Sequence, residues 1–471
     1  KYGSVICCRQ NMKESVGNPW LMMACKSGAT AASVDGMQFY GKTFRESGIP
    51  EGLLANTLGG EYSGESSVLA LQEKPFNLPA GDNYKSVFIG TYLPDHSQAT
   101  SDDDLNQLSD LMLEFDDTIQ SESSYDLVSP SWNLFNTSSF LPVDDLNGKE
   151  IDRFFDEERR HCEEENGRLL SFFSRQNNHV MLRSKETMVD RPHAHIMQTE
   201  AGYTPDESIV STTTFAYGVF NSHLTQGNTN FNILLSVCSS QFNLALETGH
   251  RIFVNIDGRY FLLGVPSAFE IGLNHCRWLY KHGDRCFQVR TWTSKKGPQV
   301  NMDFKVISGN NVRLLITHHF DDTNGWNITS GSTAREYIAK PKADSMIAGK
   351  FPHAQFRIKV NSENSEFKAC GDEVLCSNNI SQGSNLFVLD VSETYEFCMS
   401  FIGEVCSSAC ISEIKDADNQ WLSDCQDARS AWQSLCLNLS LKGGKKDTGA
   451  IQEILPWYGM NALIHYLTPY G

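Results

Sequence analysis

The stretch "GHRIFVNIDGRYFLLGVPSAFEIGLNHCRWLYKHGDRCFQVRTWTS", residues 249–294, decides the fold class. Its apolar segments, 251–265 and 285–294, are rich in β-branched and aromatic residues, and they alternate with the period of two that a strand requires. Asp257-Gly258 lies between two apolar runs, which is a strong signal for a two-residue β-hairpin. The stretch therefore predicts paired antiparallel strands.

The same period continues on both sides of this stretch. Further strand candidates are residues 178–189, 193–200, 300–320, 356–360, 385–391 and 395–404. Gly309-Asn310 is expected to turn a second hairpin within 300–320. Many strands with few helices between them predict a mainly β protein built as a large antiparallel β-sandwich.

The rest of the chain divides by composition. The expected parts are a β-rich N-terminal part (1–118) with a short helix in 101–117, a polar linker (119–149), the β-sandwich (150–405), a helical linker (411–445) and a further helix in 450–471. The charged start of the sandwich is expected to be a helix that Asn166-Gly167 ends. Pro456 is expected near the start of the last helix.

Charge and cysteine usage restrict the partners and the compartment. The formal net charge of −18 disfavours nucleic acid and anionic membranes, although a small anion at a local site stays compatible with it. No apolar run of 18 residues occurs, so no membrane span is expected. The 14 cysteines are scattered without a C-x-x-C pair, which favours free thiols in a reducing compartment and hence a cytoplasmic protein.

Sequence motifs for common chemistries are missing. The chain has no G-x-S-x-G, G-x-G-x-x-G, G-x-x-x-x-G-K-[ST] or H-E-x-x-H. His193 and His195 lie two residues apart on a predicted strand, so they share a face, but no third ligand accompanies them. Histidines that hydrogen-bond to their neighbours are the better interpretation, and no metal site is predicted. The arginines among the strands, including Arg175 and Arg290, are interpreted as solvent-facing rather than as an anion or glycan surface.

The densest polar stretch of the β region is "FNSHLTQGNTNFN", residues 220–232. Its amides and hydroxyls suit sugar hydroxyls, each of which donates and accepts a hydrogen bond. The candidate carbohydrate-binding residues here are Asn221, His223, Gln226 and Asn228. An ordinary loop whose side chains satisfy its own backbone explains the composition equally well.

Four stretches carry a resemblance to a known family. Residues 169–199, 217–237, 249–294 and 311–321, from "LLSFFSRQNNHVMLRS" to "NVRLLITHHFD", resemble the N-terminal part of the 1,2-β-oligoglucan phosphorylases, members of the glycoside hydrolase family 94 phosphorylases. The resemblance implies a galactose-mutarotase-like supersandwich, a helical linker and then an (α/α)₆ barrel. Residues 450–471 look like the first helix of that barrel, here incomplete, with Trp457 and Asn461 as candidate sugar contacts.

The chemistry that the resemblance implies is inverting phosphorolysis of 1,2-β-glucooligosaccharides to α-glucose 1-phosphate. Inorganic phosphate is the co-substrate, and no metal or cofactor is expected. The catalytic aspartate of the relatives lies beyond Gly471, so no catalytic residue is expected in this chain. The chain itself is then scaffold, homodimer interface and rim of the active site, and 220–232 is the loop expected to approach that site.

Two other functions remain open. One alternative is a complete, non-catalytic glycan-binding β-sandwich protein. A second, less favoured, is a free-standing hydrolase that uses carboxylates of the sandwich. The apolar residues of 450–471 favour the phosphorylase fragment, because such a segment needs a surface that buries it.

Overall fold

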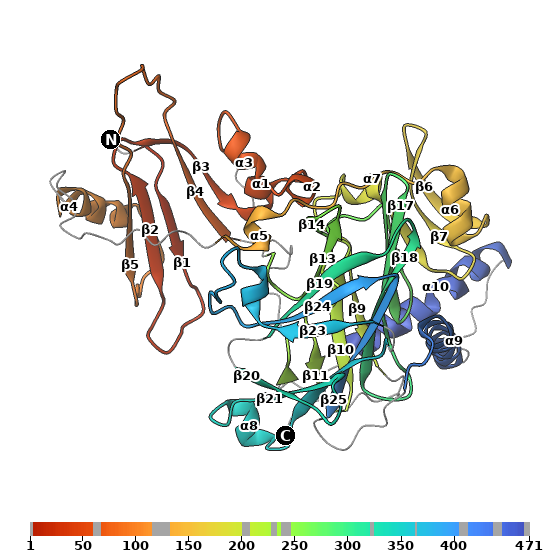
Figure 1. Ribbon diagram of the computed structural model, residues 1–471. Helices are drawn as coiled ribbons and strands as arrows, with labels where there is room; N and C mark the ends of the chain where they lie inside the picture. Colours follow the sequence, from red (N-terminus) through yellow and green to blue (C-terminus); the bar gives the residue numbers. More distant parts are fainter. Residues whose placement is uncertain are drawn as a thin grey trace. The chain divides into compact units, whose positions relative to one another are not determined.

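A computed structural model of the chain describes residues 3–59, 67–114, 132–199, 208–227, 233–236, 246–320, 325–362, 365–404, 413–436 and 445–465 (Figure 1). The chain forms two compact units, residues 1–130 and 131–471, which are described separately.

The first unit is a small β structure with short helices. An antiparallel sheet joins β1 (Ile6–Arg9), β2 (Trp20–Cys25) and β5 (Phe88–Leu93), and β3 (Ala29–Asp35) pairs with β4 (Ser67–Glu73). The helical segments are α1 (Gly36–Tyr40), α2 (Phe44–Ser47), α3 (Glu51–Leu54), η1 (Asp102–Leu105) and α4 (Asn106–Glu114). Alternate residues of β2, Trp20 and Met22, pack against Leu108 and Met112 of α4. The helix predicted within 101–117 is thus confirmed, because it buries one apolar face.

The second unit is built on large antiparallel sheets, and the mainly β, antiparallel fold class is confirmed. The largest sheet has the strand order β20-β21-β22-β25-β18-β17-β16-β15-β8-β7-β6, and a five-stranded sheet has the order β14-β13-β19-β24-β23. A four-stranded sheet has the order β12-β11-β10-β9. The bounds are β6 (Arg159–Glu165), β7 (Arg168–Ser174), β8 (His179–Leu182), β9 (Ala194–Gln198), β10 (Val210–Phe215), β11 (Thr225–Gln226), β12 (Ile233–Leu234), β13 (His250–Ile256), β14 (Arg259–Leu262), β15 (Ala268–Ile271), β16 (His275–His282), β17 (Arg285–Thr293), β18 (Gln299–Ser308), β19 (Val312–His319), β20 (Trp326–Ser330), β21 (Glu336–Pro341), β22 (Gln355–Val360), β23 (Phe367–Cys370), β24 (Leu386–Thr394) and β25 (Glu396–Glu404).

The main core lies between the five-stranded sheet and the eleven-stranded sheet. Alternate residues of β13, β19 and β24, such as Val254, Leu314 and Leu389, share one apolar cluster with Trp278 and Phe401 of the larger sheet. The other face of the five-stranded sheet is buried as well, where Phe253 and Leu315 pack against Phe135 and Phe140. Burial on both faces explains why these strands read as near-continuous apolar runs.

The segment 119–149, which reads as a polar linker, is described from residue 132 onwards. It contains α5 (Leu134–Thr137) and reaches the start of α6 (Gly148–Phe155). Its few apolar residues are placed in cores, since Phe135, Phe140, Leu141 and Leu146 are all buried.

The hairpin at Asp257-Gly258 is confirmed. β13 and β14 pair antiparallel on either side of it, with Ile256 opposite Arg259. Both turn residues have positive φ, 53° at Asp257 and 85° at Gly258, which is the geometry that Asp-Gly supplies in a type I′ turn.

Gly309-Asn310 does not turn a hairpin, so that prediction is wrong. β18 belongs to the eleven-stranded sheet and β19 to the five-stranded sheet, and the two strands do not pair. Gly309 has a φ of 97°, and the chain crosses there from one layer of the sandwich to the other. The local turn signal is real, but the sheet that each strand joins is decided by distant partners.

The helix predicted at the charged start of the sandwich is only partly correct. α6 ends at Phe155, and the charged residues that follow form β6, which pairs with β7. Asn166 and Gly167, with φ of 51° and 76°, turn that hairpin rather than ending a helix. β6 is the edge strand of its sheet, where acidic side chains remain in solvent and discourage pairing with another chain.

Two long helices, α9 (Ala417–Cys436) and α10 (Lys445–Ile464), lie side by side on the second unit (Figure 1). Trp421 of α9 packs on Trp292 of β17, with ring centroids 5.4 Å apart. Pro456 lies inside α10 rather than near its start, because the helix already begins at Lys445. The remaining short helices are α7 (Arg183–Glu186), α8 (Met346–Lys350) and η2 (Asp372–Leu375). Among the described residues, no helix combines the length and the hydrophobicity that a membrane span needs.

Candidate functional site

The predicted sugar-binding loop begins inside the protein. Asn221 is fully buried, and its side chain joins three strands. Its Oδ1 accepts hydrogen bonds from Thr212 Oγ1 (3.2 Å) and Thr291 Oγ1 (3.1 Å), and its Nδ2 lies 3.2 Å from His250 Nδ1. In this structure the Asn221 amide therefore links β10, β17 and β13.

The other loop candidates differ in exposure. His223 is half-buried, and its Nδ1 lies 3.1 Å from Ser222 Oγ. Gln226 is buried in β11, where its Nε2 donates to the Ser208 carbonyl at 3.3 Å. Asn228 lies outside the described residues. A role in sugar binding stays a prediction for all four residues. Of the three that the structure describes, His223 is the one that is partly exposed.

The two candidates on α10 differ in exposure. Trp457 is half-buried, and its indole Nε1–H donates to the Asn177 carbonyl at 3.3 Å. Asn461, one turn further along, is exposed. Trp457 also lies 6.0 Å from the ring of His195, so it connects α10 to β9.

Trp457 lines a hollow of about 420 Å³ between α9, α10 and the turn that joins β7 to β8. We call it the α9–α10 hollow. Its polar lining includes Arg160, Asn177, Arg429, Gln433 and Gln452. Amides, guanidinium groups and an indole together offer donors, acceptors and a flat apolar face. The sequence had singled out Trp457 but none of these five polar residues, which come from separate parts of the chain.

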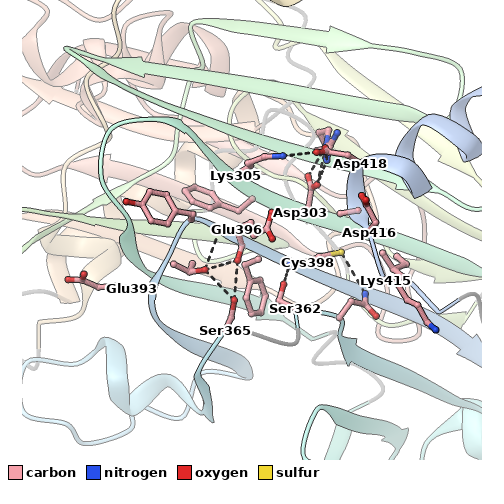
Figure 2. A pocket seen from close by; sticks show the side chains of 18 residues that line it. Asp303, Lys305, Ser362, Ser365, Glu393, Glu396, Cys398, Lys415, Asp416 and Asp418 are labelled. Atoms are coloured by element: carbon pink, nitrogen blue, oxygen red, sulfur yellow. Dashed lines mark hydrogen bonds and ion pairs between the residues drawn. The ribbon is translucent and has the colours of Figure 1, made fainter.

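A second hollow of about 610 Å³ lies between the β24–β25 hairpin and the start of α9 (Figure 2). We call it the β24–β25 groove. An ion-pair network crosses one end of it: Arg290 binds Asp303 and, at 2.6 Å, Asp418, which also binds Lys305 at 2.6 Å. Burial alone would raise the pKa of Asp418, but hydrogen bonds from Lys305 and Arg290 lower it. The network holds α9 to the sheet, and its charges are already paired.

The position of Arg290 shows that the prediction of solvent-facing strand arginines is wrong for this residue. The strand arginines were expected to face solvent, yet Arg290 is only 6% exposed. Asp303 on the neighbouring strand and Asp418 on α9 compensate its charge, as a buried guanidinium requires. Arg175 agrees with the expectation, since its side chain is 72% exposed.

The histidines His193 and His195 have different surroundings. His193 Nδ1 lies 2.7 Å from Glu186 Oε2, and His195 is buried, which lowers its pKa to about 4. Over the described ranges, no group of three or more His, Cys, Asp or Glu side chains is arranged to hold a metal ion.

Comparisons with known proteins identify two family domains. Residues 157–403 match the glycoside phosphorylase supersandwich domain, and residues 1–90 match the SOGP N-terminal domain. A 1,2-β-oligoglucan phosphorylase of Listeria innocua is 25% identical over 481 aligned positions, which cover 100% of this chain and 42% of that protein. The chain thus spans less than half the length of this relative.

Similar solved structures include a polysaccharide lyase (14% identity, TM-score 0.28, 44% of this chain and 33% of that one). The heparan sulfate lyase HepC of Pedobacter heparinus is a second (10% identity, TM-score 0.20, 50% of this chain and 35% of that one). These scores are too low to inform the function.

Proposed function

Because the chain belongs to the glycoside phosphorylases that carry a supersandwich domain, we propose that it is the N-terminal portion of an enzyme that splits 1,2-β-glucooligosaccharides with inorganic phosphate. The observation that carries this proposal is the alignment of one 1,2-β-oligoglucan phosphorylase over the whole of this chain. The match to the SOGP N-terminal domain comes first in the chain, and the match to the supersandwich domain follows it, which supports the proposal of an N-terminal portion.

The proposed reaction is phosphorolysis with inversion. A phosphate oxygen attacks the anomeric carbon of the terminal glucose, and the bond from that carbon to the bridging oxygen breaks. A general acid protonates the leaving oxygen, which releases the shortened glucan and α-glucose 1-phosphate. Phosphate is itself the nucleophile, so a second protein carboxylate is not required. We place the general acid in the part of the enzyme that this chain does not include.

This chain then has a structural role and forms part of the rim of the site. Its residues Ile451, Ile454 and Tyr458 lie on one side of α10 and are 44%, 36% and 66% exposed. We propose that a helical catalytic domain packs on this apolar side. The loop around His223 is the proposed approach to the substrate, and the active enzyme is proposed to be a homodimer.

The test is a phosphorolysis assay on two proteins. The product of the whole reading frame that encodes this chain is expected to release glucose 1-phosphate from 1,2-β-glucooligosaccharides, in proportion to added phosphate. The 471-residue chain alone is expected to release none, because it lacks the proposed acid. The 1,3- and 1,4-linked glucooligosaccharides serve as controls for linkage.

Each result bears on a different part of the proposal. Product from a control linkage only would refute the proposed substrate and keep phosphorolysis. No glucose 1-phosphate from any of these glucans would refute the proposed reaction. Glucan binding by the 471-residue chain, without turnover by either protein, would favour a non-catalytic glycan-binding protein.

A further inference from the structure

The α9–α10 hollow has walls that hydrogen bonds hold in place. Asn177, in the turn between β7 and β8, donates from its Nδ2 to the Glu453 carbonyl of α10 at 2.6 Å. Its own carbonyl accepts from the Trp457 indole at 3.3 Å. These two bonds tie α10 to the turn, so the shape of the hollow does not depend on exposed side chains alone.

Two of the three arginines of the hollow have protein partners. Arg160 forms an ion pair with Glu453 (2.8 Å) and donates to the Ser174 and Arg175 carbonyls at 3.3 and 3.0 Å. Arg175 lies 3.7 Å from Glu158. Glu453 is thus paired with Arg160, and its second oxygen lies 3.6 Å from His161 Nε2.

Arg429 is the exception. It extends from α9 into the hollow and is half-buried, but it has no hydrogen bond or ion pair within the described part of the chain. A half-buried guanidinium without a counterion is unfavourable, because burial removes water that no anion replaces. It is especially unusual in a chain whose formal net charge is −18. Arg429 therefore presents an unpaired cation to the hollow, where an anion can reach it.

The groups around Arg429 indicate what kind of anion fits. A guanidinium presents a planar fork of donors that matches a phosphate or carboxylate. Gln433 and Gln452 are exposed on the same hollow, and amides both donate to and accept from hydroxyls. Trp457 adds an aromatic surface that suits the apolar face of a sugar ring. A volume of about 420 Å³ accommodates a small ligand rather than a polymer.

We propose that the α9–α10 hollow binds a phosphorylated monosaccharide, with the phosphate on Arg429 and the hydroxyls on Gln433 and Gln452. The choice of sugar rests on the proposed function, because glucose 1-phosphate is the phosphorylated sugar that such an enzyme releases. The site lies on the sandwich and its helices, so it is additional to the catalytic site proposed for the rest of the enzyme.

Isothermal titration calorimetry on the 471-residue chain tests the proposal with three probes: glucose 1-phosphate, inorganic phosphate and glucose. Glucose 1-phosphate is expected to bind best, inorganic phosphate more weakly and glucose not measurably. Arg429→Gln is expected to weaken the binding of glucose 1-phosphate and of inorganic phosphate about tenfold or more. The matched control is Lys296→Gln, which removes one positive charge near α9 but outside the hollow, and it is expected to leave binding unchanged.

A second pair of variants separates the two halves of the ligand. Gln433→Ala with Gln452→Ala alters only exposed side chains, so folding is expected to persist. This double variant is expected to weaken the binding of glucose 1-phosphate about tenfold and to leave the binding of inorganic phosphate unchanged. Equal binding of the two probes, without an effect of the glutamines, would overturn the sugar part and leave a plain phosphate site. Unchanged binding in Arg429→Gln would overturn the proposal as a whole.

The outcome is separable from that of the proposed function. Binding is measured without turnover, and the phosphorolysis assay does not depend on the hollow. Turnover by the whole reading frame, together with no binding to the 471-residue chain, would refute this inference alone. Binding that Arg429→Gln abolishes, together with no phosphorolysis, would refute the function and leave the site.

Discussion

His318 offers a sharp test of the physical argument for this fold, through the substitution His318→Phe. The ring is 1% exposed, and neither of its nitrogens has a hydrogen-bond partner in the described structure. Its neighbours are aromatic: Phe401 at 4.7 Å, Phe320 at 5.2 Å and His250 at 5.5 Å between ring centroids. Burial, and then the proximity of His250 and His319, lower the pKa of His318 well below its ordinary value.

The effect of the substitution at pH 7 follows from the unsatisfied nitrogens. A buried polar group without a partner lowers the stability of the folded state by about 1–3 kcal/mol. A phenyl ring among other aromatic rings has no polar atom to desolvate, so it avoids this penalty. Phenylalanine fills slightly more space, which offsets part of the gain. We expect His318→Phe to raise the free energy of unfolding by about 1–2 kcal/mol at pH 7.

The effect grows as the pH falls. In the unfolded chain His318 has a pKa of about 6.5, so between pH 7 and pH 5 the unfolded state takes up a proton that the native state excludes. Because its pKa is lowered on folding, the stability it contributes is present above about pH 6.5 and is lost below it. For one histidine the loss from pH 7 to pH 5 is about 2 kcal/mol. His250, whose pKa burial lowers to about 3, behaves in the same way and remains neutral beside His318 at pH 5.

Urea unfolding of both proteins at pH 7 and pH 5, followed by tryptophan fluorescence, measures this difference. The advantage of His318→Phe over the parent is expected to be about 2 kcal/mol larger at pH 5 than at pH 7. His353→Phe, at an exposed position, is the matched control and is expected to show no such increase. If parent and His318→Phe lose the same stability between the two pH values, the reasoning about the buried ring is refuted.

Three further predictions concern α10, the buried ion pair and the loop. Removing α10 by ending the chain at residue 444 is expected to lower the melting temperature in calorimetry, because Met460 is buried and the Asn177–Glu453 bond is lost; an unchanged melting temperature would contradict the packing of α10 on the sandwich. Asp303→Asn is expected to lower the free energy of unfolding in urea by about 3–5 kcal/mol, because it leaves the buried Arg290 with Asp418 as its remaining partner. Asp257→Asn, at an exposed ion pair, is the control and is expected to lower it by less than about 1 kcal/mol. In the product of the whole reading frame, His223→Ala is expected to raise KM or lower kcat for 1,2-β-glucooligosaccharides about tenfold with an unchanged melting temperature, and unchanged kinetics would show that the loop does not approach the substrate.

The candidate site was only partly readable from the sequence. Trp457 was named for its place in a family-like helix, and the structure puts it in the α9–α10 hollow. Arg429 and Asn177 carried no signal, because an arginine on a helix and an asparagine in a turn are common on surfaces. What distinguishes them is that Arg429 has no partner in the described structure and that Asn177 bonds to α10. The bond of Asn177 depends on α10, which is more than a hundred positions away in the chain.

Features that depend on neighbouring residues were predictable from local sequence patterns. The period of two along 249–294 predicted the strands, and Asp257-Gly258 predicted its hairpin, because both turn residues there need a positive φ. The tertiary structure alone decided which strands share a sheet. Gly309-Asn310 has the same kind of turn signal, yet it links two layers, because pairing depends on the partners of β18 and β19 elsewhere in the chain. The acidic strand β6 also depends on tertiary structure, because it forms by pairing with β7. Its position at the edge of the sheet keeps the charged side chains in water, and local β-propensity does not encode that position.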